Sequence, residues 1–67
     1  MNITLNHNQT QLDAITLTVR ELLTIKKFTF KMLVIKVNGV LVKKDQYEHF
    51  TIHENDDVQV IHLVSGG

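Results

Sequence analysis

The 67-residue chain contains no cysteine, no proline and no tryptophan, and only three glycines. Without cysteine it has no disulfide framework and none of the usual cysteine-based zinc or redox sites. Its longest apolar run, Met32 to Ile35, is far too short to cross a bilayer, which takes about 20 residues. The first residues form neither a basic leader nor an apolar one. We therefore expect a protein without a membrane partner, located in the cytoplasm.

Net charge and aromatic residues are also scarce. Seven basic and seven acidic side chains cancel, and the rings are three Phe and one Tyr, so nucleic-acid binding is not indicated. The charges are nevertheless segregated, because every Lys and Arg lies within residues 20–44, whereas residues 45–67 carry five acids and no Lys or Arg. Such asymmetry can orient a charged partner. We favour the simpler interpretation that the two segments meet in the fold and neutralise each other.

The small size of the chain argues against an enzyme. A protein of 7.7 kDa buries only about 60% of the surface that its unfolded chain exposes, which leaves little core for a deep active site. His49 and His53 have the i, i+4 spacing of helical metal ligands, but the residues between them look extended and no third ligand is evident. We expect no bound metal or cofactor, and no catalysis by this chain alone.

Alternating apolar and polar side chains at the start of the chain predict a β-hairpin. Ile3 and Leu5 alternate with polar neighbours, which is the period-two pattern of a strand with one buried face. We expect a tight turn at His7–Asn8, because Asn tolerates positive φ. A second strand is expected over about residues 9–13.

A helix is predicted to follow the hairpin. Thr18 and Glu21 are spaced as a capping box, in which each side chain bonds the backbone N–H of the other residue. Leu17 and Leu22 occupy the two positions of a hydrophobic staple. We expect the helix to end at Lys26–Lys27, where its dipole favours positive charge.

The second half of the chain is rich in strand signals. Residues 32–37 are mostly apolar and predict a strand. Asn38–Gly39 predicts a two-residue hairpin turn that leads into a strand over residues 40–42. Residues 43–49 are expected to form an irregular turn or one helical turn. A long final strand is predicted over residues 58–64.

This order of elements predicts an α+β protein with the β-grasp arrangement. The first and last strands would pair in the middle of a mixed sheet of about five strands, with the helix packed on one face. One helix covers only one face of a sheet, so the opposite face should be partly open. We expect a single domain over residues 1–64.

The sequence ends in Ser65-Gly66-Gly67, which we expect to form a flexible tail, since successive glycines weaken a strand. A tail whose last two residues lack Cβ atoms can enter a narrow enzymatic channel and present its α-carboxylate, which is ionised at neutral pH. Attack of that carboxylate on the α-phosphate of ATP would give an acyl-adenylate. A sulfur nucleophile would then yield a thiocarboxylate, and an amine would yield an amide.

The activating site must belong to another protein, because no Gly-rich phosphate loop is present. The alternative is a frayed end.

Three further motifs accompany this tail. They are Thr18-Val19-Arg20-Glu21-Leu22-Leu23, Val37-Asn38-Gly39 followed by Val42, and Asp56-Asp57-Val58-Gln59-Val60 leading into Ile61-His62-Leu63-Val64-Ser65-Gly66-Gly67. On these motifs, and over nearly its whole length, the chain resembles the ThiS family, the ubiquitin-like β-grasp sulfur carriers of thiamine biosynthesis. Many members have Gly-Asp where this chain has Asn55-Asp56, and Asn can take the same positive φ.

The resemblance implies a role and a set of partners. An E1-like (ThiF-like) enzyme would use ATP to adenylate Gly67, which would become a thiocarboxylate with sulfur from a donor such as a cysteine desulfurase. A thiazole synthase (ThiG-like) would then consume that sulfur. Ser65 and Gly66 would form the slender tail, and the protein would carry sulfur covalently without binding a cofactor.

The alternation of the final strand suggests where such partners dock. Val58 and Val60 would face the helix, which places Ile61 and Leu63 on the less covered face near the tail. We expect Ile61, Leu63 and the adjoining Val64 to form a partner-binding patch. The alternative is burial of Ile61 and Leu63 beneath residues 43–50.

Three other functions remain open at this point. The small subunit of molybdopterin synthase would share the fold, the tail and the adenylation chemistry. A β-grasp interaction module would have an inert tail, and a protein modifier would join its tail to lysines of other proteins.

Overall fold

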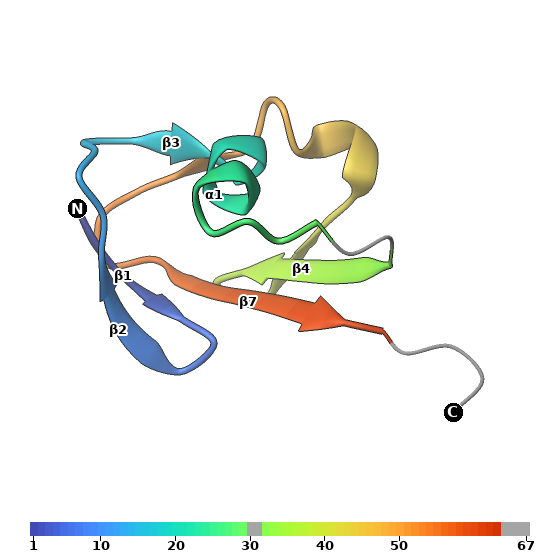
Figure 1. The fold of residues 1–67 in the computed structure, drawn as a ribbon, viewed down its shortest axis with the longest axis horizontal. Helices are drawn as coiled ribbons and strands as arrows, with labels where there is room; N and C mark the ends of the chain where they lie inside the picture. The colour runs from blue at the N-terminus through green and yellow to red at the C-terminus, as the bar shows by residue number, and fades with distance from the viewer. Residues whose placement is uncertain (30–31, 64–67) are drawn as a thin grey trace.

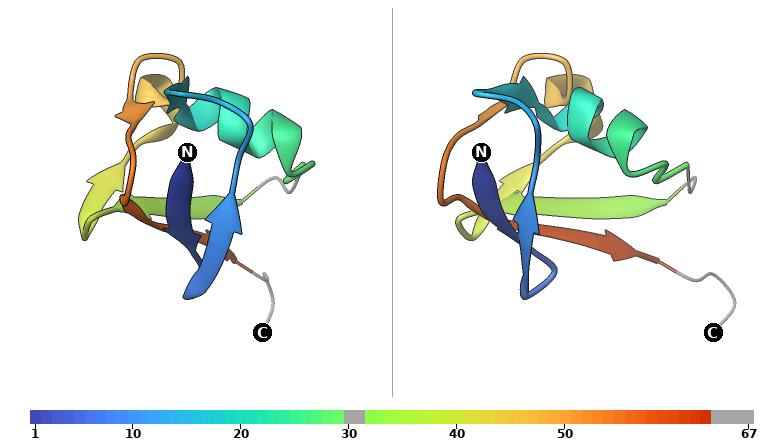
Figure 2. Two further views of the ribbon diagram at one scale, coloured as in Figure 1. Left: turned by 90° about the vertical axis from the view of Figure 1, so that its left-hand side faces the viewer. Right: turned by 60° about the vertical axis from the view of Figure 1, so that its left-hand side comes forward.

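The computed structural model describes residues 1–29 and 32–63. A mixed sheet forms one layer and a single α-helix lies across one of its faces (Figures 1 and 2). In chain order the elements are β1 (Asn2–Leu5), β2 (Asn8–Gln11), β3 (Leu17–Thr18), α1 (Val19–Ile25), β4 (Leu33–Val37), β5 (Val40–Val42), the 3-10 helix η1 (Lys44–Gln46), β6 (Thr51–Ile52) and β7 (Asp57–His62). Within the described ranges, no helix is long and apolar enough to cross a membrane.

The strand order β2-β1-β7-β4-β5 confirms the predicted β-grasp fold. β1 and β7 pair in parallel at the centre of the five-stranded sheet, while the other pairs in this sheet are antiparallel. β3 and β6 add a two-stranded sheet that the sequence analysis did not predict. Each strand of that small sheet has only two residues, too few to show a period-two pattern.

The first hairpin turns one residue earlier than predicted. Its turn residues are Asn6 and His7, with φ of 49° and 68°, and not His7 and Asn8. Two hydrogen bonds to β7 hold Asn6 in place. Its backbone N–H donates to the Val58 carbonyl at 2.9 Å, and its Oδ1 accepts from the Val60 N–H at 2.8 Å. The Asn6 side chain thus continues the parallel ladder beyond the end of β1.

The helix begins with the predicted capping box. Thr18 Oγ1 accepts from the Glu21 N–H at 3.1 Å, and Glu21 Oε1 accepts from the Thr18 N–H at 2.7 Å. Its C-terminal end is a Schellman motif with Lys27 in the left-handed region at φ 58°. The Phe28 N–H donates to the Leu23 carbonyl at 2.9 Å, which seats the Phe28 ring against the core.

The core lies between α1 and the covered face of the sheet. Val58 and Val60 of β7 face the helix, as the alternation predicted, with 0% and 8% of their surfaces exposed. The helix contributes Val19, Leu22 and Leu23. The buried residues are Ile3, Leu5, Leu12, Leu17, Val19, Leu22, Leu23, Ile35, Val37, Val42, Tyr47, Ile52, Val58 and Val60. Every one of them except Tyr47 is purely hydrocarbon, so burial and packing supply most of the stability.

The Asn38 side chain connects the second hairpin to the start of β7. Asn38–Gly39 forms the predicted turn, with φ of 52° and 80°. Asn38 Nδ2 donates to Asp56 Oδ1 at 3.0 Å, and Asn38 Oδ1 accepts from the Asp57 N–H at 2.8 Å. Asp56 Oδ2 also accepts from the His53 N–H at 2.9 Å. Two of the sequence motifs therefore meet in one hydrogen-bond network that fixes where β7 begins.

Replacing Thr18 with Ala removes the side-chain acceptor of the capping box. We expect the free energy of unfolding to fall by about 0.5–2 kcal/mol, measured by urea denaturation followed by circular dichroism. Thr16→Ala, at an exposed position just before the cap, is the matched control and should have little effect. Equal stability of the two variants would contradict the assigned cap.

Asn38→Gly keeps a residue that accepts positive φ but removes both side-chain hydrogen bonds to residues 56 and 57. We expect a loss of about 1–3 kcal/mol in the free energy of unfolding. The control is Asn55→Gly, also at positive φ (68°), whose side chain takes no part in this network. It should be neutral, and an equal loss at both positions would contradict the network.

Candidate functional site

β7 carries the chain from the middle of the sheet toward its candidate reactive end. Figure 1 shows the C-terminal end of β7 on the side of the molecule opposite the N terminus. β4 follows β7 to its last residues, since Leu33 pairs with His62 and the Leu63 N–H donates to the Met32 carbonyl at 3.0 Å. The predicted tail Ser65-Gly66-Gly67, together with Val64, lies outside the described residues. The chain therefore enters this segment from a strand that is anchored on its β4 side.

Ile61 and Leu63 are both exposed, at 41% and 44% of their surfaces. Burial beneath residues 43–50, the alternative considered for them, is therefore wrong. Ile61 alternates with the buried Val60 and so lies on the sheet face that α1 leaves uncovered. The predicted exposure near the end of β7 is confirmed for both residues, while their role in docking stays a prediction.

Two neighbouring strands extend the apolar surface around Ile61. Val34 pairs directly with Ile61, and Leu41, which is 52% exposed, pairs with Lys36 on the same face. We call Val34, Leu41 and Ile61 the sheet-face patch. Leu41 was missed by the sequence analysis, although the Asn38–Gly39 turn sets the register that places it on this face. A patch of this kind is typical of a surface that meets another protein.

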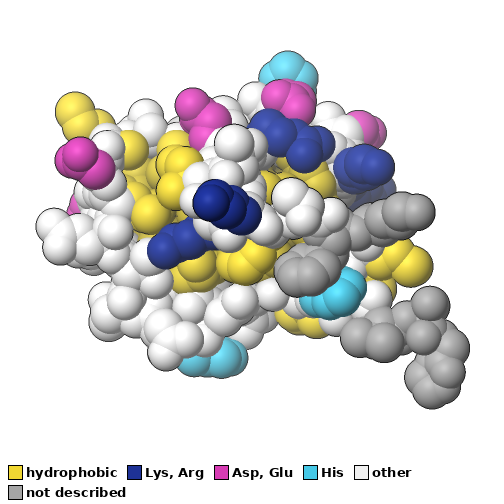
Figure 3. Space-filling model, viewed as in Figure 1, with side chains coloured by type: hydrophobic (Ala, Val, Ile, Leu, Met, Phe, Trp, Pro, Cys, Tyr) yellow, Lys and Arg dark blue, Asp and Glu magenta, His cyan; other side chains and the backbone are white. Residues whose placement is uncertain are grey.

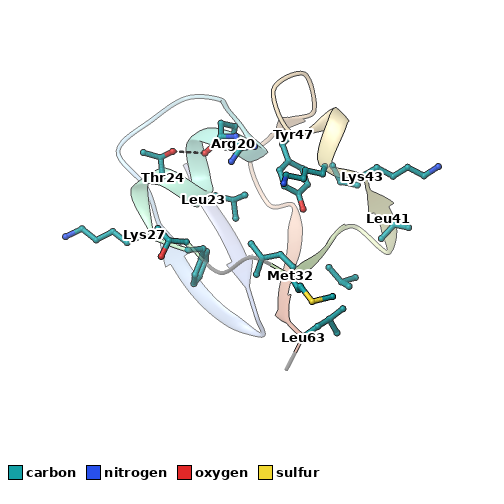
Figure 4. A pocket seen from close by; sticks show the side chains of 15 residues that line it. Arg20, Leu23, Thr24, Lys27, Met32, Leu41, Lys43, Tyr47 and Leu63 are labelled. Carbon is teal, nitrogen blue, oxygen red and sulfur yellow. Dashed lines mark hydrogen bonds between the residues drawn. The ribbon is translucent and has the colours of Figure 1, made fainter. Parts of the chain in front are cut away.

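Leu63 lies just beyond β7 and lines an open pocket of about 740 Å³ beside the helix (Figure 4). We call it the basic-rimmed pocket; its walls come from α1, the start of β4, the end of β5 and η1. Its lining includes Leu23, Lys27, Met32, Lys43, Tyr47 and Leu63. The sequence analysis missed this pocket because segments far apart in the chain form it, and the one signal for it was the cluster of cations within residues 20–44.

The predicted charge neutralisation occurs at one point in the described parts of the chain. Arg20 Nε donates to Glu48 Oε1 at 2.8 Å, and the Arg20 guanidinium lies 5.3 Å from the centre of the Tyr47 ring. The remaining basic residues of the pocket have no such pair among residues 1–29 and 32–63. Within these same ranges, no three His, Asp or Glu side chains are grouped as a metal site, so His49 and His53 gain no further ligand.

These features define a β-grasp protein with an exposed apolar surface near the C-terminal end of its central strand. The sequence model of the ThiS family matches residues 2–67, and the chain belongs to that family. No curated protein matched.

Two solved structures of ThiS-type proteins are similar to this chain. The crystal structure of the thiamine biosynthesis protein ThiS from Geobacter metallireducens is 28% identical, with a TM-score of 0.90 over all of both chains. The solution NMR structure of a thiamine biosynthesis protein from the same organism is also 28% identical, with a TM-score of 0.82 over all of this chain and 88% of the other.

Aspartate at Ile61 or Leu63 should leave the fold intact, because both side chains already contact water. We expect the free energy of unfolding to change by about 1 kcal/mol or less for Ile61→Asp and Leu63→Asp. Val60→Asp would bury an unpaired charge and should prevent folding. Urea denaturation and near-ultraviolet circular dichroism would test this difference, and unfolding of the Ile61→Asp protein would contradict the assigned exposure.

Proposed function

We propose that this protein carries sulfur for thiamine biosynthesis as a thiocarboxylate on Gly67. The observation that carries the proposal is the match of the ThiS family over residues 2–67, which includes the Gly-Gly segment. Similarity to thiamine biosynthesis proteins over the whole chain supports the same role. The geometry supports it too, since β4 anchors β7 up to its last residue and the exposed Ile61 and Leu63 lie at the C-terminal end of this strand.

The chemistry proceeds in two steps on the α-carboxylate of Gly67. A carboxylate oxygen attacks the α-phosphorus of ATP. The bond between this phosphorus and the oxygen that bridges it to the β-phosphate breaks, and pyrophosphate leaves. The product is a mixed anhydride between the Gly67 acyl group and AMP. A sulfur nucleophile at the oxidation level of sulfide then attacks the acyl carbon, AMP leaves, and the thiocarboxylate remains.

The chain's own part in these steps is presentation. A carboxylate is a weak electrophile, so the energy for sulfur transfer comes from ATP and from the enzyme that binds it. Two glycines without side chains let the tail pass through a narrow channel into that enzyme. This division of labour agrees with a small protein whose surface serves recognition and whose catalytic groups belong to its partners.

We assign three kinds of partner to this role. An E1-like adenylating enzyme activates Gly67, and a thiazole synthase takes up the sulfur. The sulfur comes from a donor such as a cysteine desulfurase, whose persulfide sulfur a thiol reductant brings to the oxidation level of sulfide. The sheet-face patch and Leu63 are the surfaces that we assign to docking. Their apolar side chains lie close to the start of the tail, so a protein that holds the tail also covers them.

The test is intact-mass spectrometry after incubation with ATP, the E1-like enzyme and a sulfur source. We expect a mass gain that corresponds to replacement of one oxygen by sulfur in the full chain. A variant that lacks Gly67 should show no gain in mass, because its terminal carboxylate, now on Gly66, would end one residue short of the activating site.

Other masses would point to the alternative functions. An unchanged mass for the full chain, with stable partner binding, would overturn the proposal and indicate an inert interaction module. A ladder of larger adducts would indicate a protein modifier. Transfer of the sulfur to a molybdopterin precursor and not to a thiazole would place the carrier in the other pathway.

A further inference from the structure

The basic-rimmed pocket has a one-sided charge. Among the described residues that line it, four are basic, namely Arg20, Lys27, Lys43 and Lys44, and none is acidic. Figure 3 shows Lys and Arg side chains around hydrophobic surface on this face of the molecule. The segregation of charge along the sequence is thus preserved at this pocket in the fold.

Three of the four cations lack a partner among the described residues. Arg20 is paired with Glu48 at 2.8 Å, whereas Lys27, Lys43 and Lys44 form no ion pair within those ranges. All three lysines are exposed, and Figure 4 shows the chains of Lys27 and Lys43 extending outward on opposite sides of the pocket. The positive charge therefore lies on the rim, where it can meet acidic groups on both sides of an inserted residue.

The inner surface of the pocket is apolar and partly open to water. Met32 and Leu63 are exposed at 53% and 44% of their surfaces, and Leu23 and Phe28 also line the pocket. Thr24, a polar lining residue, already donates its hydroxyl to the Arg20 carbonyl at 3.0 Å. A small anion is held best by polar donors that converge on it, whereas the inner surface here is lined mainly by apolar side chains. An apolar side chain flanked by carboxylates fits this arrangement better.

The position of the pocket connects it to the tail. Leu63 forms part of its lining, and Gly67 follows Leu63 by four residues, a span of at most about 14 Å when fully extended. A protein that engages Gly67 must therefore come close to the pocket. Val34 and Leu41 of the sheet-face patch also line the pocket, so the two surfaces are continuous.

We propose that the basic-rimmed pocket extends the docking surface for the enzyme that activates Gly67 and is occupied by an acidic segment of that enzyme with an apolar side chain at its centre. This inference rests on the proposed function for the identity of the partner. The lysines steer the acidic segment and set its register, and Met32 and Leu63 bury the apolar side chain.

The test measures the affinity of the carrier for the E1-like enzyme by isothermal titration calorimetry without ATP, so that binding is separated from chemistry. We expect Lys43→Glu and Lys44→Glu each to weaken binding about tenfold at low salt, and added salt to weaken binding of the unmodified protein. The matched control is Lys26→Glu, which makes the same charge change at an exposed lysine outside the pocket and should stay within twofold of the unmodified protein.

A second pair of variants tests the apolar part of the site. Met32→Asp should weaken binding at least tenfold, because it places a carboxylate where the acidic segment docks. Ile15→Asp is the matched control, since Ile15 is 90% exposed and lies outside the pocket. Far-ultraviolet circular dichroism of each variant would verify that the fold is retained.

Several outcomes would overturn the inference. Unchanged affinity for all the pocket variants would do so, as would equal losses for the pocket variants and their controls. The binding of small anions can be followed by NMR through the backbone amide chemical shifts of the pocket residues. If inorganic phosphate or ATP alone changes these shifts as much as the enzyme does, the pocket is a small-anion site instead. If the enzyme binds the full chain but forms no adenylate on it, the proposed function is wrong, whereas the docking inference is judged by the binding affinities alone.

Discussion

The parallel pairing of β1 with β7 is the constraint on which the structure depends. It joins the hairpin of β1 and β2 to that of β4 and β5, because β7 lies between them and pairs with both. Side-chain amides reinforce this junction: Asn6 extends the ladder to Val60, and Asn38 holds Asp56 and Asp57 at the strand's start. The strand that leads to the tail is thereby the most firmly positioned element of the sheet.

Most of the fold could be predicted from local signals. The capping box at Thr18 and Glu21, the Asn38–Gly39 turn and the alternation of β7 each appear within a few residues of sequence, and each is confirmed. The turn at Asn6–His7 was placed one residue late because its position is set by contacts with β7, about fifty residues away in sequence. Lys27 takes the left-handed conformation that Gly usually adopts at this position, so no signal in the sequence indicated the Schellman motif.

The candidate site was predictable in part, for the same reason. Alternation placed Ile61 on the less covered face, since Val60 beside it faces the helix, but it left burial beneath residues 43–50 open, and the structure shows Ile61 exposed. The basic-rimmed pocket could not be predicted, because it arises only when α1, β4 and η1 meet in three dimensions. The charge pattern was interpreted mainly as mutual neutralisation, with a charged partner as the alternative, and the fold shows that only Arg20 of the pocket's cations is paired within the described residues.

The central place of β7 has a consequence for synthesis of the protein. A nascent chain that has emerged only as far as Asn55 contains both hairpins but lacks the strand that joins them, so its sheet cannot close. An isolated hairpin is marginally stable in water, and folding must wait until residues 57–62 have left the ribosome. Incomplete chains would then remain open to proteolysis, which would remove molecules whose sheet has not closed.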